Sequence, residues 1–229
     1  MLPPTQHNNR PIALFYFQEI AMRAVTQPRA LETRDRIVQT AAGLFALKGF
    51  HDTKLEEIQR TAEVSSGAFF HHFQSKDDLG FAVIDRHMEK RRQLLDQIEQ
   101  ELPPSKDEGP LTPVFRRLDA IAEMLKRRQH TKGGCIIGNL STALSDTHEA
   151  FRSRLAACFD EMAQEFLPHL EIAARQSGLM QRSQCRNLAR YIVTVIEGAI
   201  MLARTHRDPK LAACQFDYLK QHLEKTVNG

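Results

Sequence analysis

One segment of this 229-residue chain has residue types and spacing suited to reading DNA. Small side chains are followed, within two helical turns, by aromatic and imidazole side chains: Ser65, Ser66, Gly67, Ala68, Phe70, His71 and His72. Small residues at the start of a short helix let its backbone approach the bases of the major groove. Hydroxyl and imidazole groups beyond them can then face the base edges. The segment therefore indicates DNA recognition.

Adjacent histidines can also bind a metal ion, but a metal site needs further ligands. No third ligand has a spacing that matches His71 and His72, so the sequence favours a pair that faces the groove or solvent. The four cysteines form no C-x-x-C pair, which argues against zinc and against a disulfide scaffold: Cys135, Cys158, Cys185 and Cys214. Such thiols are typical of a reducing compartment, the cytoplasm. We expect no metal, no cofactor and no catalytic residue.

Cys135 stands between Gly133-Gly134 and an apolar helix start, where amide dipoles can lower the pKa of a thiol. A reactive thiol here would sense electrophiles or oxidants. The sequence favours the alternative, a small buried side chain at a tight helix contact, because Lys132 is its only basic neighbour in sequence.

Glu197 interrupts the apolar run from Tyr191 to Ala203. A carboxylate at this position could contact a small-molecule effector in an internal pocket, pair with a charge across an interface between two subunits, or simply face solvent. Apolar side chains at helical spacing could line a pocket with it, although such residues form the core more often. The candidate effector-binding residues are Met88, Ile121, Met124, Cys135, Phe159, Met162 and Glu197.

Apolar residues recur at helical spacing along most of the chain, and no alternating strand pattern of useful length occurs. We predict an all-α protein of about nine helices. Thr53 with Glu56, and Ser75 with Asp78, have the form of capping boxes, and Ser65 or Ser66 can cap a short helix between them. Beyond a proline-rich loop the predicted helices are 113–130, 136–145, 148–177, 184–206 and 209–226.

Three regions follow from this pattern: an N-terminal extension at 1–28, a DNA-binding domain at 29–80 and a larger domain at 81–229. The extension is interpreted as a mobile leader rather than a short docking helix. No apolar run approaches the roughly 18 residues that a membrane span needs, which excludes an integral membrane protein.

The stretch from Thr33 to Leu79 resembles the DNA-binding domain of TetR-type transcriptional regulators. The resemblance rests on A-x-x-L-F-x-x-x-G-F, on I-x-x-x-A-x-V-S-x-G-A and on the aromatic-His-Phe-x-x-K ending. It implies that Ser66, Gly67, Ala68, Phe70, His71 and His72 lie along the groove. It also implies that Arg34, Arg36, Thr53, Lys54 and Lys76 contact phosphates. The rest of the chain would form a helical domain for effector binding and dimerisation, and the segments G-G-C-I-I-G-N-L and E-G-A-I-M-L-A-R resemble one branch of the family.

The sequence departs from the family pattern at three positions. Glu56 stands where a basic or small residue is common, and Phe70 replaces a tyrosine and its hydroxyl. Glu63 stands where glycine is common, so it is expected to adopt a positive φ, which is unfavourable for a residue with a Cβ. These differences bear on operator affinity rather than on the fold.

The function expected is that of a repressor that binds a palindromic double-stranded DNA operator as a homodimer. The two subunits would pair through the helices at about 184–206 and 209–226. A small-molecule effector, electrophilic if Cys135 is reactive, would release it. A helical enzyme is the first rival, which turnover without DNA would reveal. A protein-interaction module is the second, and DNA binding that weakens steeply with salt would exclude it.

The charge of the chain is unevenly distributed. Residues 29–80 hold seven basic and eight acidic side chains, whereas residues 81–229 hold 22 and 19. The predicted DNA-binding domain is therefore not the basic part of the protein. Its binding must rest on a few placed cations and on helix N-termini, and we expect a modest salt dependence for each subunit.

Overall fold

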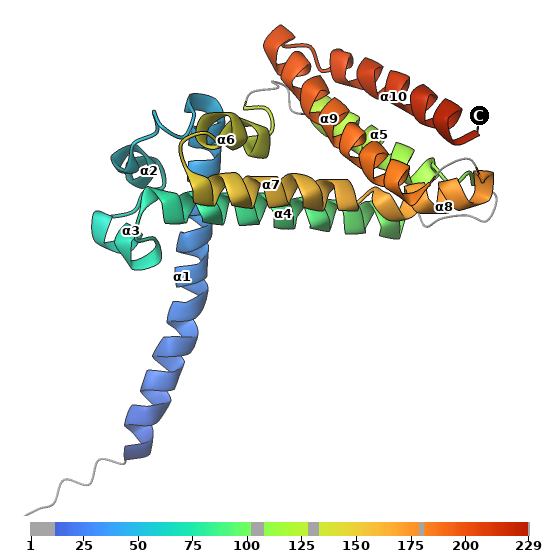
Figure 1. The fold of residues 1–229 in the computed structure, drawn as a ribbon. Helices are drawn as coiled ribbons and strands as arrows, with labels where there is room; N and C mark the ends of the chain where they lie inside the picture. Colours follow the sequence, from blue (N-terminus) through green and yellow to red (C-terminus); the bar gives the residue numbers. More distant parts are fainter. Residues whose placement is uncertain (1–11, 102–107, 128–132, 179–180, 229) are drawn as a thin grey trace, which may run out of the picture.

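The computed structural model describes residues 12–101, 108–127, 133–178 and 181–228, and only the backbone of 12–28, 99, 182 and 228 (Figure 1). Within these residues the chain forms ten α-helices and no strand. The helices are α1 (Ile12–Lys48), α2 (Leu55–Thr61), α3 (Ser66–His72), α4 (Lys76–Glu101), α5 (Thr112–Arg127), α6 (Ile136–Leu144), α7 (Glu149–Gln164), α8 (Leu167–Ser177), α9 (Arg182–His206) and α10 (Lys210–Asn228).

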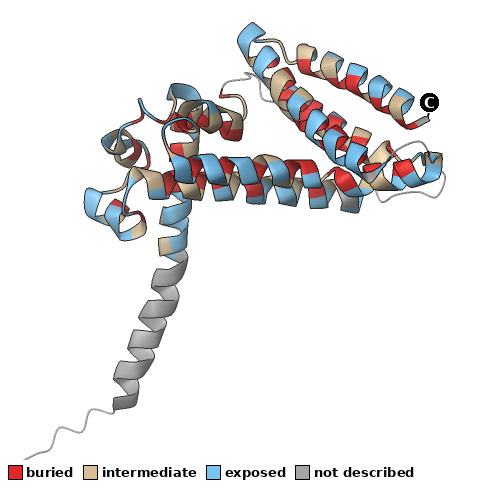
Figure 2. Ribbon diagram, viewed as in Figure 1, coloured by how far each residue is buried: buried red, intermediate tan, exposed pale blue. Residues whose placement is uncertain are grey.

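Two groups of helices are joined by α4. The C-terminal part of α1 packs with α2 and α3 at one end of the molecule, while α4 crosses α1 and runs beside α7 toward α9 and α10 (Figure 1). One continuous core follows this path, with its buried residues on the facing sides of the helices (Figure 2). The rings of Phe50 and Phe151, whose centroids lie 5.4 Å apart, connect the first group to α7. The helices predicted to bind DNA therefore share a core with the larger domain.

The all-α class is confirmed, with one difference in how the helices divide. The stretch 148–177, which we expected as one helix, is two helices, α7 and α8. Pro168 lies in the first turn of α8. Proline has no N–H and its ring would clash with the carbonyl four residues earlier, so it is tolerated at a helix start but not inside a helix.

The backbone shows no break at residue 28, where we placed the boundary of the N-terminal extension. Residues 12–28 continue α1 as a helix, whereas the mobility that we expected of this segment stays a prediction. Residues 1–11 of the proposed extension lie outside the described part of the chain.

The helix caps were predicted correctly for α3 and α4 but not for α2. The Ser65 hydroxyl accepts from the Ala68 N–H at 3.2 Å, and the Ser75 hydroxyl accepts from the Asp78 N–H at 3.0 Å. Before α2, however, Lys54 is the N-cap and no side chain caps the helix. The Thr53 hydroxyl instead donates to the Gly49 carbonyl at 2.8 Å, because carbonyls at the end of α1 lack helical partners.

Glu63, in the turn between α2 and α3, has φ 52°, as the sequence predicted. Glu63→Gly is expected to stabilise the fold by about 0.5–1 kcal/mol, because glycine enters the left-handed region without steric cost. The midpoint of thermal unfolding should rise by about 2–4 °C. Glu56→Gly, within α2, is the control and should lower it. A lower midpoint for Glu63→Gly would contradict the assignment of strain to this turn.

Candidate DNA-binding helices and effector pocket

The helix α3 presents one side to solvent because its other side is anchored in the core. Phe69 and Phe73 are buried one helical turn apart, with ring centroids 5.9 Å apart. Phe70, between them, is 51% exposed. The other predicted groove residues are exposed, or in two cases half-buried: Ser65, Ser66, Gly67, Ala68, His71 and His72. A seven-residue helix thus offers a surface of hydroxyl, aromatic and imidazole groups.

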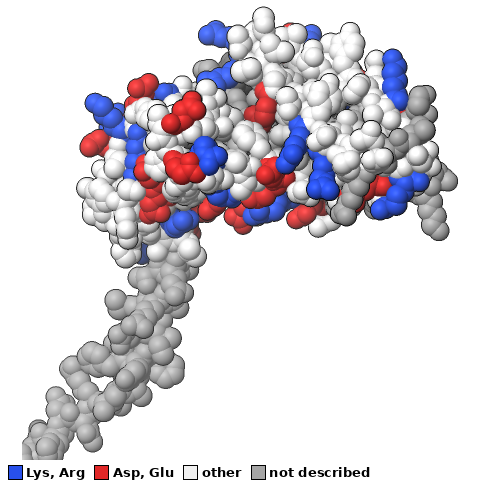
Figure 3. All heavy atoms as spheres, in the orientation of Figure 1, with Lys and Arg blue, Asp and Glu red and all other residues white. Residues whose placement is uncertain are grey.

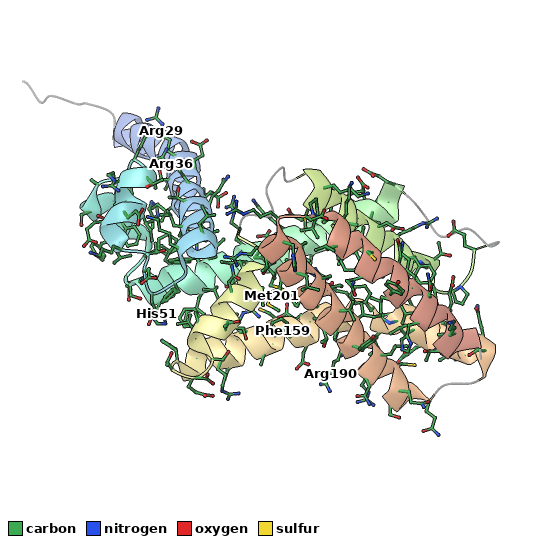
Figure 4. The ribbon with its side chains drawn as sticks, turned by 90° about the horizontal axis from the view of Figure 1, so that it is seen from above. Arg29, Arg36, His51, Phe159, Arg190 and Met201 are labelled. Carbon is green, nitrogen blue, oxygen red and sulfur yellow. The ribbon has the colours of Figure 1, made fainter. Side chains whose placement is uncertain are left out.

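Arg34 extends this surface from α1. Its guanidinium carbon lies 5.1 Å from the centroid of the Phe73 ring, at the end of α3. Burial lowers the pKa of His72, and the charges of His71 and Arg34 lower it further. His72 is therefore neutral at pH 7, with one ring nitrogen free to accept a hydrogen bond. Arg36 is exposed on α1, at the end of the molecule far from Arg190 (Figure 4).

Two of the predicted phosphate contacts are engaged within the protein. The Thr53 side chain is fully buried and its hydroxyl is bonded to Gly49. The Lys76 amine donates to the His51 carbonyl at 3.3 Å and lies 4.6 Å from the centroid of the Phe50 ring. Burial lowers the pKa of Lys76, although Asp77 and Asp52 oppose this effect. In this conformation both side chains pack against the turn before α2, whereas Lys54 is exposed. Their phosphate contacts stay a prediction.

Polar contacts join the helices predicted to bind DNA to the larger domain. The His148 Nε2 atom, before α7, lies 3.0 Å from an Asp77 oxygen in the first turn of α4. The His51 Nε2 atom lies 3.2 Å from the Ala143 carbonyl of α6. The partners are 71 and 92 residues apart, so no local sequence signal identifies them. These contacts join α7 to α4 and α6 to the turn before α2.

A pocket of about 370 Å³ lies between α7 and α9. Two of its residues, Phe159 and Glu197, were predicted as effector contacts. Figure 4 shows Phe159 and Arg190 on the same side of the molecule. The lining residues are Phe159, Asp160, Arg190, Val193, Thr194 and Glu197. Of the four that we did not predict, Asp160, Arg190 and Thr194 are exposed polar residues and Val193 is a buried apolar one. Neither type carries a sequence signal that separates a pocket from a solvated surface or from the core.

Glu197 joins this pocket to the start of α6. Its carboxyl hydrogen-bonds with the Cys135 thiol, while its Oε1 atom is buried without a hydrogen-bond donor among the described residues. Its Oε2 atom lies 2.6 Å from where a Cβ of Gly138 would stand, so a side chain at that position would have to displace the Glu197 carboxyl. Burial raises the pKa of Glu197, against the lowering effects of the Cys135 hydrogen bond and the Arg91 charge.

Cys135 does not have the properties of a reactive thiol in this conformation. Burial, and then the charge of Glu197, raise its pKa to about 12, despite hydrogen bonds from the Gly138 and Ile137 amides. Because the thiolate is the nucleophile, the protonated thiol is inert at neutral pH. The favoured interpretation, a small side chain at a helix contact, agrees with this geometry.

The remaining effector candidates divide between core and surface. Met88, Ile121 and Met162 are buried in the hydrophobic core, and Met124 is half-buried on α5. Helical spacing identified the side of α4, α5 and α7 that packs inward, and the structure assigns the three buried residues to that packing. In the basic stretch at 90–92 of α4, Arg91 is largely buried, with its Nη2 atom 2.7 Å from the Glu165 Oε2 atom.

A pH dependence follows from the raised pKa of Glu197. Below the ordinary carboxyl pKa, the group is protonated in both the folded and the unfolded chain. Above it, the unfolded chain loses the proton first, so the folded state loses stability as the pH rises to its own, higher pKa. Glu197→Gln should therefore unfold at the wild-type temperature at pH 4 and a few degrees higher at pH 8.

Thermal unfolding between pH 4 and pH 8 measures this difference. Glu224→Gln, at an exposed position on α10, is the control and should follow the wild type throughout. Parallel curves for Glu197→Gln and the wild type would show that the buried carboxyl is not the cause.

Within the described residues, no three His, Cys, Asp or Glu side chains are grouped so that they could hold a metal ion. None of the helices in that part of the chain is both long and apolar enough to span a membrane.

Comparison with known proteins agrees with this geometry. Residues 37–83 match the family described as bacterial regulatory proteins, tetR family, and residues 114–217 match the tetracyclin repressor-like C-terminal domain. An uncharacterized HTH-type transcriptional regulator of Lactococcus lactis is 29% identical over 195 residues, 84% of this chain and 94% of its own. The HTH-type transcriptional repressor DhaR of a Mycobacterium species is 23% identical over 176 residues, 76% of this chain and 84% of its own.

Solved structures show the same fold. A TetR regulatory protein of Rhodobacter sphaeroides superposes with a TM-score of 0.72 at 22% identity, over 82% of this chain and 97% of its own.

Proposed function

Because the chain belongs to the TetR family of transcriptional regulators, we propose that it is a repressor that binds a palindromic operator as a homodimer and leaves it when a small molecule binds. A transcriptional regulator of this family is not an enzyme, so the first rival is excluded. The exposed side of α3, held by the buried rings of Phe69 and Phe73, is the observation that carries the proposal. One such helix contacts only a few base pairs, and two half-sites supply the specificity that an operator needs.

The proposed dimer interface lies on α9 and α10. Large apolar side chains are exposed there: Tyr191, Met201, Leu202 and Tyr218. The two helices pack side by side, and mostly uncharged side chains cover them in the view of Figure 3. Pairing two copies through these helices would make a four-helix interface and bury the apolar side chains.

The proposed effector site is the pocket between α7 and α9. The buried Glu197 Oε1 atom lacks a donor among the described residues, and Phe159 offers an apolar wall. These features suit an effector that donates a hydrogen bond and carries an apolar group. They do not favour the electrophile, because the Cys135 thiol stays protonated. An effector that shifts α7 acts on α4 through His148 and Asp77. The shift of α4 then changes the spacing of the two α3 helices in the dimer.

Binding to DNA selected from random palindromes, and to the DNA that flanks its own gene, tests the proposal. Retardation that weakens with salt is expected, with Phe70→Ala/His71→Ala binding more weakly at unchanged thermal stability. Gln100→Ala, at an exposed position on α4 outside α3 and the proposed interface, is the control. Failure to retard any selected palindrome would refute DNA recognition and leave the interaction module as the alternative.

A further inference from the structure

A second pocket, of about 380 Å³, lies between α1, α4 and the start of α6. It shares no residue with the pocket between α7 and α9. Its volume is within the range of small-molecule sites. We propose that it binds a small organic anion with an apolar body, and that binding weakens the hold of α1 on α4.

The positive charge of this pocket comes from α4. Arg86 and Lys90, one helical turn apart, both line it, and none of its lining residues is acidic. Two like charges at this spacing repel each other, and an anion between them removes the repulsion. Lys90 forms no ion pair with any residue that the structure describes.

Arg86 is only partly satisfied. Its Nη1 atom lies 2.7 Å from an Asp35 oxygen of α1. Its Nε atom is buried and has no acceptor among the described residues. A buried donor without a partner carries a desolvation penalty, and an oxygen of a carboxylate or a phosphate would relieve it. The head group that fits is therefore an anion with oxygen acceptors.

The opposite wall, from α1 and α6, is apolar except for Gln39. Ala46 and Ile136 line it, and no heavy atom lies within 4 Å of where a Cβ of Gly43 would stand. Open space beside apolar groups suits a hydrocarbon body rather than a second charge. The class of ligand is thus an amphiphilic organic anion, such as an alkyl carboxylate or an alkyl phosphate.

Occupation of this pocket would act on the DNA-binding helices. The pair between Arg86 and Asp35 joins α4 to α1, and Asp35 stands between Arg34 and Arg36. An anion that engages Arg86 competes with Asp35 for it, so α1 is held less firmly. This regulatory part rests on the proposed function, and by linkage the operator and the anion should each weaken the other's binding.

Calorimetry with the full-length protein and sodium octanoate tests the site, with octanol as the probe that lacks the charge. We expect octanoate to bind at least tenfold more tightly than octanol. Lys90→Gln should weaken octanoate binding severalfold and Gly43→Leu should abolish it. Asp35→Asn should strengthen it, because Arg86 loses its competing carboxylate.

Matched controls separate this pocket from other sites. Arg92→Gln removes an exposed cation from the same helix, and Glu197→Gln alters the other pocket; neither should change octanoate binding. Thermal unfolding of Gly43→Leu checks that this variant folds. If it does not fold, octanoate binding by Lys90→Gln and Asp35→Asn tests the site instead. Absence of octanoate binding, equal binding of octanol, or unchanged binding by Lys90→Gln and Asp35→Asn would each overturn the site.

Operator affinity with and without octanoate tests the regulation. Octanoate should lower the affinity of the wild type and leave that of Gly43→Leu unchanged. Octanoate binding without an effect on the operator would overturn the regulatory part alone. If the protein binds no operator, the proposed function is refuted. The calorimetry would still show whether the pocket between α1, α4 and α6 binds the anion.

Discussion

Met201→Glu is expected to leave the chain monomeric and to lower its affinity for a palindromic operator by about 100-fold or more. Met201 is 63% exposed on α9, in the apolar surface proposed to pair the subunits. In the dimer, a carboxylate at this position would be buried without a hydrogen-bonding partner. The free energy of that desolvation exceeds the apolar contact energy that one methionine contributes to the interface, so the dimer dissociates. A monomer keeps one α3 helix and therefore reads one half-site.

Analytical ultracentrifugation and operator titration on the same samples measure both effects. Ile172→Glu is the matched control, because Ile172 is also an exposed apolar residue, at 40%, but lies on α8 outside the proposed interface. It should remain dimeric and bind normally. A dimeric Met201→Glu with full affinity would place the interface elsewhere.

Phe69→Ala is expected to destabilise the DNA-binding helices by about 3–5 kcal/mol and to abolish operator binding. The Phe69 side chain is fully buried, and its ring contacts those of Phe70 and Phe73. A helix of seven residues is too short to persist without tertiary packing, so removal of its anchor releases the whole recognition surface.

The neighbouring Phe70→Ala variant supplies the comparison, since it removes the same side chain from the exposed side of the same helix. Its stability should change by about 0.5 kcal/mol or less while its operator affinity falls. Urea unfolding measures the stability of each variant, and titration with operator DNA measures its affinity. Equal destabilisation by the two substitutions would contradict the assignment of Phe69 as the anchor and Phe70 as the contact.

Features decided over a few residues were accessible from the sequence. The Ser65 and Ser75 caps, the positive φ of Glu63 and the inward side of α3 each depend on neighbours within one helical turn. Helix formation and capping are governed by such local contacts. The fold class and the recognition segment follow from the same kind of signal.

Features that depend on competition between partners were not accessible. The Thr53 hydroxyl had two local partners available, and it bonds the Gly49 carbonyl rather than an amide of α2. Lys76 was expected at a phosphate, yet it packs on Phe50 and His51, which the approach of α4 brings beside it. A side chain's type shows what it can bind, but the nearest partner depends on how the helices pack.

By itself, the sequence determined that the chain is all-helical, because helical periodicity and capping are local. From the same local pattern it predicts that the segment at 65–72 faces DNA. Only the tertiary structure decided the electrostatics of its pockets. Glu197, 62 residues beyond Cys135, raises the pKa of that thiol, and Asp35, 51 residues before Arg86, occupies one side of its guanidinium. Burial and pairing between distant residues set these properties, since both the loss of water and the neighbouring charge arise only when the helices pack.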